Sequence, residues 1–81
     1  MKRLEEIHRR AADTHEAAAG RHVEAAERWA VIGDEEYAAL ERRNAELEFQ
    51  LAELERDRAK LEARRTFHQE SRPGEDRPAL R

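Results

Sequence analysis

Three histidines at a helical spacing are the residues with the clearest potential for chemistry. His8, His15 and His22 follow one another every seven residues, and Trp29 continues the same row. A neutral imidazole binds transition metals, and an imidazole also gains a proton close to physiological pH. Seven residues span about 10.5 Å of a helix, so two neighbouring histidines of this row cannot share one ion.

A metal site in this row would therefore need ligands from another helix. Glu5 and His8 form one Glu-x-x-His pair, whereas di-iron helical bundles use two such pairs and two further glutamates. We therefore expect no metal and no cofactor. A mild pH response is the better expectation, because protonating half-buried imidazoles near pH 6 would loosen the packing around them. A metal-binding or pH-responsive helical protein that uses His8, His15 and His22 is thus the alternative function.

Composition argues against several other classes. The 81 residues contain no cysteine and carry a net charge of −3. No Gly-rich phosphate loop or catalytic set is visible, so we expect no enzyme. There is no basic excess to hold a nucleic-acid backbone. No apolar run has the length of a signal peptide or a membrane span, so we expect a cytoplasmic protein without membrane contact.

A leucine-rich heptad pattern is the most specific signal in the chain. Leucines recur every seventh residue, and the positions between them complete an a/d pattern. We call this set the leucine seam; its members are Tyr37, Leu40, Asn44, Leu47, Leu51, Leu54, Arg58 and Leu61. The segment from Tyr37 to Leu61 resembles generic leucine-zipper coiled coils. That resemblance implies association with a protein partner and implies no activity.

One asparagine within the seam bears on the mode of association. Asn44 occupies an a position, where asparagine fixes register and favours a parallel two-stranded coil. The flanking g and e positions place like charges together, Glu36 with Glu41 and Asp57 with Glu62, so a heteromeric partner is also open. A third interpretation makes the seam the core of an intramolecular hairpin, because short loops make antiparallel neighbours common.

The Gly33-Asp34 pair divides the helical pattern into two parts. Glycine is favoured just past a helix end and aspartate at the start of the next helix, so this pair predicts a tight turn. A four-residue stutter within one continuous helix is the alternative. The predicted organisation is a first helix over residues 1–32, a turn at 33–34, a second helix over 35–66 and a disordered tail over 67–81.

Folding the chain at this turn places large side chains opposite small ones. In the predicted register, each ring of the first helix faces an alanine of the second, and Ala18 faces Phe49. Such alternation lets two helices interdigitate closely. The residues expected to pack within the chain are His8, His15, Ala18, His22, Trp29, Ala38, Ala45, Phe49, Ala52 and Ala59.

The sequence therefore predicts an all-α protein, a helical hairpin that assembles as a dimeric four-helix bundle or coiled coil. The predicted function is non-catalytic association, as an oligomerisation module, adaptor or small scaffold subunit. Its partner would be a second copy in parallel or a heteromeric coiled-coil protein. The identity of the partner, the biological pathway and the role of the tail stay open.

Overall fold

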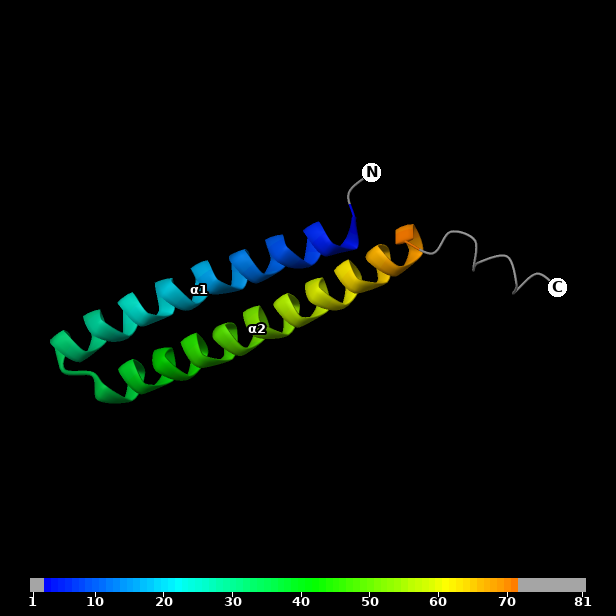
Figure 1. Ribbon diagram of the computed structural model, residues 1–81. Helices are drawn as coiled ribbons and strands as arrows, with labels where there is room; N and C mark the ends of the chain where they lie inside the picture. Colours follow the sequence, from blue (N-terminus) through cyan, green and yellow to red (C-terminus); the bar gives the residue numbers. More distant parts are fainter. Residues whose placement is uncertain (1–2, 72–81) are drawn as a thin grey trace.

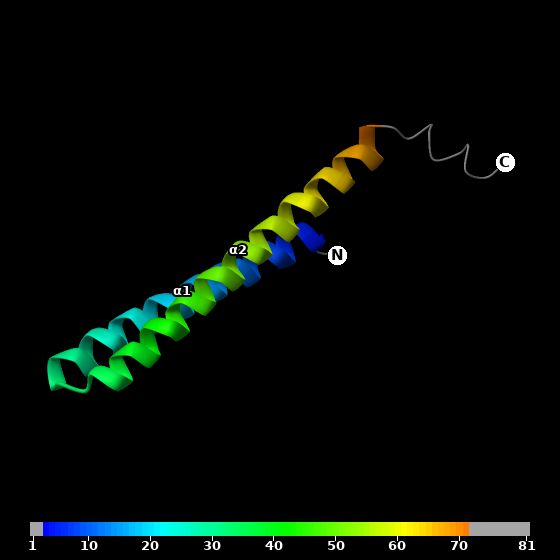
Figure 2. The ribbon, with the colours of Figure 1, turned by 90° about the horizontal axis from the view of Figure 1, so that it is seen from below.

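The structure is a helical hairpin. The computed structural model describes residues 3–71, with α1 spanning Leu4–Ile32 and α2 spanning Glu35–Ser71. Figures 1 and 2 show the two helices side by side and antiparallel, with the end of α2 continuing past the start of α1. No strand occurs within residues 3–71. The predicted hairpin and its all-α class are thus confirmed.

The turn forms as a helix stop followed directly by a helix start. Gly33 has φ 98°, in the left-handed region, and its N–H donates to the carbonyls of Trp29 and Ala30, both at 3.0 Å. The N–H of Asp34 also donates to Trp29, which completes the Schellman arrangement. The Asp34 carboxylate then accepts from the N–H of Tyr37 at 3.0 Å, as an N-cap does. The chain therefore makes a tight turn here and has no stutter.

The core between the helices consists of alanine alone. Among the described residues, every buried side chain is an alanine at most 3% exposed, and these alanines recur every seven residues on each helix. Alanine side chains let the two backbones approach closely. The core residues are Ala12, Ala19 and Ala26 in α1, and Ala38, Ala45, Ala52 and Ala59 in α2.

The second helix is longer than its sequence pattern indicates. It continues to Ser71, beyond the predicted end at residue 66, so residues 67–71 are helical where the start of the tail was expected. No glycine or proline lies between Thr66 and Ser71, and Pro73 is the first residue that disfavours a helix before it. The rest of the predicted tail, residues 72–81, lies outside the described residues.

A histidine–glutamate ladder beside an exposed leucine seam

Three histidine–glutamate pairs connect the two helices. In each pair the Nδ1 atom of a histidine in α1 lies 2.6 Å from the Oε1 atom of a glutamate in α2. The pairs repeat every seven residues on both helices, so they form a regular series along one flank of the alanine core. We call this series the histidine–glutamate ladder; its rungs are His8–Glu55, His15–Glu48 and His22–Glu41.

The rungs are partly shielded from water. The histidine side chains are 23–33% exposed and the glutamate side chains 16–26%. A neutral imidazole that carries its proton on Nδ1 donates to the carboxylate, and a doubly protonated imidazole donates with a positive charge as well. The ladder can therefore form with either state of the imidazole.

The first rung differs from the other two in its neighbours. Arg58 also contacts Glu55, with Nη1 3.1 Å from Oε2. The hydrogen bond from His8, helped by the charge of Arg58, holds the pKa of the Glu55 carboxyl below its usual range against the opposing effect of burial. No basic residue lies three or four positions from Glu48 or Glu41 on α2.

The row of rings on α1, His8, His15, His22 and Trp29, lies at the helix interface, and glutamates provide the polar partners of its histidines. The histidines are half-buried, and the expected partner alanines are buried in the adjacent core. Trp29 stacks on Tyr37, with ring centroids 4.4 Å apart and planes at 24°. Sequence reasoning missed the glutamate row. Its seven-residue spacing, matched to the spacing of the histidines, was the available signal.

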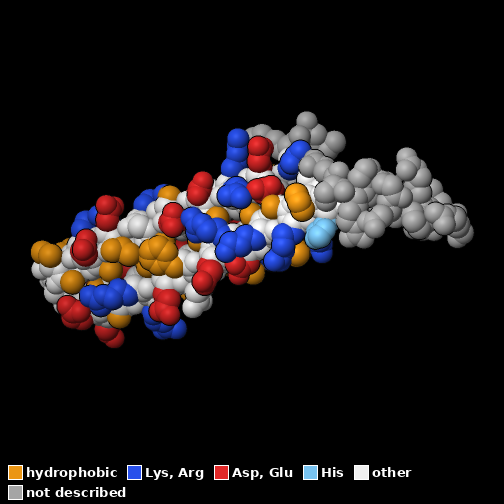
Figure 3. All heavy atoms as spheres, viewed as in Figure 1, with side chains coloured by type: hydrophobic (Ala, Val, Ile, Leu, Met, Phe, Trp, Pro, Cys, Tyr) orange, Lys and Arg blue, Asp and Glu red, His pale blue; other side chains and the backbone are white. Residues whose placement is uncertain are grey.

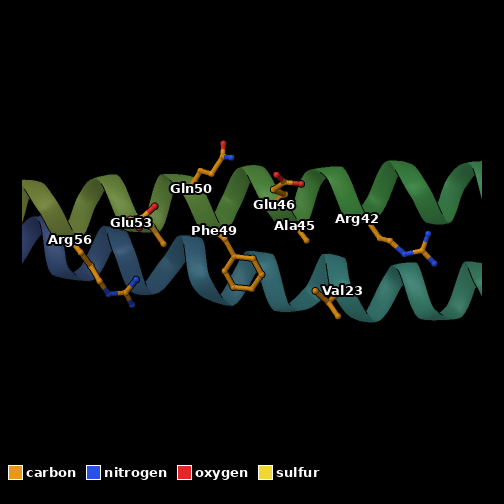
Figure 4. A pocket seen from close by; sticks show the side chains of 9 residues that line it. Val23, Arg42, Ala45, Glu46, Phe49, Gln50, Glu53 and Arg56 are labelled. Carbon is orange, nitrogen blue, oxygen red and sulfur yellow. The ribbon is translucent and has the colours of Figure 1, made fainter.

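Phe49 lies on the other flank of the core. Its ring reaches from α2 across α1 near Val23, in a shallow groove that also includes Arg42 and Arg56 (Figure 4). Phe49 remains 46% exposed, so α1 covers only part of it. Ala18, its predicted partner, is half-buried and is not among the residues that line this groove.

The leucine seam faces away from α1. Its leucines, Leu40, Leu47, Leu51, Leu54 and Leu61, are 40–58% exposed, and Tyr37 is 47% exposed. Asn44 is half-buried, and Arg58 is exposed and bonded to Glu55. The interpretation of the seam as the intramolecular core is therefore wrong, because alanine fills that position and leaves no room for the larger leucines.

The seam adjoins the ladder along one side of the hairpin. Arg58, at an a position of the seam, bonds to Glu55 of the ladder, and Tyr37 at the start of the seam stacks on Trp29 of the ring row. The other flank carries ion pairs between the helices, in which Arg56 contacts Glu16 at 3.2 Å and Asp13 at 3.8 Å. Figure 3 shows a face on which acidic and basic side chains alternate, with a group of hydrophobic side chains among them on the half nearer the turn. The two flanks thus differ in their polar contacts, with histidine–glutamate pairs on one and arginine ion pairs on the other.

Other types of site find no support in the geometry. Within residues 3–71, no three histidine, aspartate or glutamate side chains gather closely enough to hold a metal ion. Neither described helix is long and apolar enough to cross a membrane. No protein-family model, curated protein or solved structure matches this chain.

Proposed function

We propose that this protein is a non-catalytic association module whose partner is a second copy of the same chain. Two α2 helices lie in parallel and bury their leucine seams against each other, while each α1 remains packed on the alanine face of its own α2. The assembly contains four helices. This proposal rests on the seam, on the composition of the core and on the charges beside the seam.

The exposed seam is the observation that carries the proposal. Five leucines in one heptad pattern are 40–58% exposed, while the described part of the hairpin buries nothing larger than alanine. A small protein with so little buried apolar surface gains much of its stability from association. A row of exposed large apolar side chains is typical of a protein-binding site. The a/d spacing specifies another helix as the occupant.

The charges beside the seam are compatible with a second copy as the partner. In a parallel dimer, Glu36 of one chain would approach Glu41 of the other, and Asp57 would approach Glu62. Glu41 is bonded to His22, and Glu62 is bonded to Arg65 at 3.4 Å. These intramolecular partners draw the carboxylates away and offset the like-charge repulsion expected from sequence. Self-association therefore has a weaker electrostatic obstacle than the sequence indicates.

Asn44 sets the direction of the two copies. In a parallel, in-register pair, Asn44 meets Asn44 of the second copy, and the two amides can bond to each other. In an antiparallel a-to-d packing, the same amide would face leucine and lose a hydrogen-bond partner, at a cost of about 1–3 kcal/mol. The parallel arrangement is therefore the favoured one.

The molar mass in solution tests this proposal. Light scattering coupled to gel filtration should give a dimer for the wild-type chain and a monomer for Leu47→Glu, because a carboxylate in the seam cannot be buried without a partner. Val31→Glu is the matched control, since Val31 is 88% exposed and lies outside the seam. It should remain dimeric. A wild-type chain that stays monomeric at high concentration rejects the proposal, and so does a Leu47→Glu chain that still forms the dimer.

A further inference from the structure

The histidine–glutamate ladder joins the two helices through groups whose charge depends on pH, and association through the seam does not require such groups. Each rung combines an imidazole, which can carry one proton or two, with a carboxylate. The two groups come from different helices and lie 2.6 Å apart in all three rungs. The charge of the imidazole therefore acts directly on the contact between α1 and α2.

We propose that the histidine–glutamate ladder is a proton-dependent clamp that tightens the hairpin at mildly acidic pH. A protonated imidazole faces a carboxylate in the folded hairpin, and this contact is lost when the helices separate. The carboxylate already makes a charge-assisted hydrogen bond with a neutral imidazole, and a protonated imidazole adds the attraction between opposite charges. We therefore expect the added stability at mildly acidic pH and its loss at alkaline pH.

This direction is the opposite of the loosening expected from the histidine row alone. The expectation of loosening assumed that the imidazoles face alanine, where a new charge would be buried without a partner. The glutamates supply that partner. The clamp therefore depends on Glu41, Glu48 and Glu55 as much as on the histidines.

The charged neighbours predict which rungs respond most. On α1, every residue three or four positions from His15 or His22 is an alanine, so no other charge of that helix competes there. On α2, only the Glu55 rung has a nearby cation, Arg58, which already neutralises part of the carboxylate charge. Glu5 stands three positions before His8 and is bonded to Arg9. The two rungs of His15 and His22 should therefore carry most of the effect.

Thermal unfolding followed by circular dichroism tests the clamp in the full chain. The wild-type midpoint should rise by about 5 °C or more between about pH 8 and pH 5.5. The double variant His15→Gln/His22→Gln should lose most of that rise, because glutamine stays neutral at both values. The control His68→Gln should keep it, because His68 is exposed and lies outside the ladder. A wild-type midpoint that is unchanged or falls, or a double variant that keeps the rise, overturns the proposal.

A second double variant tests the clamp if the histidine double variant does not fold. Glu41→Gln/Glu48→Gln keeps a carbonyl acceptor at each rung and removes its charge, so it should also lose most of the rise. If the midpoint of Glu41→Gln/Glu48→Gln still rises at acidic pH as in the wild type, the clamp proposal is wrong.

The melts should also be repeated at a concentration where light scattering shows a monomer. If the unfolding midpoint of the monomer also rises at acidic pH, the added stability comes from the contact between α1 and α2. If the midpoint rises only in the dimer, the added stability comes from association, which overturns the clamp and leaves the proposed dimer unaffected.

Discussion

The Nδ1 atom of His15 in α1 lies 2.6 Å from the Oε1 atom of Glu48 in α2, although 33 residues separate them in the chain. So short a contact requires the two helix backbones to stay close. The alanine core permits this approach, because Ala19 and Ala45 are at most 3% exposed and present only a methyl group to the other helix. The size of the core residues and the formation of the ladder are thus mechanically linked.

Enlarging one core alanine should weaken the hairpin. Ala19→Leu introduces three carbon atoms where no space exists, so the helices must separate or the side chain must strain, at about 1–3 kcal/mol. Urea denaturation measures the loss of unfolding free energy. Ala17→Leu is the control, because Ala17 is exposed, and it should change the stability by no more than about 0.5 kcal/mol. Equal effects at both positions would contradict the alanine core.

Gly20 and Gly33 should respond in opposite directions to substitution by alanine. Gly33 has φ 98°, so Gly33→Ala forces a side chain into the left-handed region and should cost about 1–2 kcal/mol. Gly20 lies inside α1, and a methyl group added there would meet open space, so Gly20→Ala should stabilise the hairpin by about 0.5–1 kcal/mol. Thermal melts of the two variants provide the comparison. Loss of stability from both changes would show that Gly20 is needed for a contact.

Removing the amide from the seam should alter the assembly. Asn44→Leu replaces the residue that specifies a parallel pair by one that packs equally well in other arrangements. We expect a more stable assembly with a mixed or higher oligomeric order. Analytical ultracentrifugation across a range of concentrations measures both properties. An unchanged dimer with unchanged stability would show that Asn44 does not lie in the interface between copies.

Acid should release the first rung of the ladder. The pKa of Glu55 is lowered in the folded state by the hydrogen bond from His8, so this carboxylate stabilises the hairpin above the unfolded-state value of about 4.3. That stability is lost as the pH falls below about 4.3 and through the lowered pKa. Glu55→Gln should therefore flatten the acid side of a stability–pH profile measured by urea denaturation. Glu53→Gln, at an exposed position, serves as the control and should keep the wild-type profile.

The turn and the hairpin could be predicted because local signals specify them. Gly33 and Asp34 satisfy the end of one helix and the start of the next without help from the rest of the chain. The alanine rows were visible for a similar reason, since a seven-residue period repeats on one face of a helix. The end of α2 was harder to place, because residues 67–71 are compatible with both a helix and a tail.

The ladder could not be found by reading each helix separately. Glu41, Glu48 and Glu55 occupy e positions of the leucine seam, and e positions were assigned to contacts between chains. Their true partners become evident only when the polar rows of both helices are placed in the same antiparallel register.

The seven-residue repeat of the core makes the length of the hairpin adjustable in fixed steps. Three repeats each contribute one buried alanine from each helix and one rung of the ladder, and Ala59 adds a fourth buried alanine in α2. Inserting seven residues into both helices at equal distances from the turn would add one complete unit and lengthen the arm by about 10.5 Å. An insertion in only one helix would leave the two rows out of step. The length of the hairpin can therefore change only in steps of one heptad in both helices.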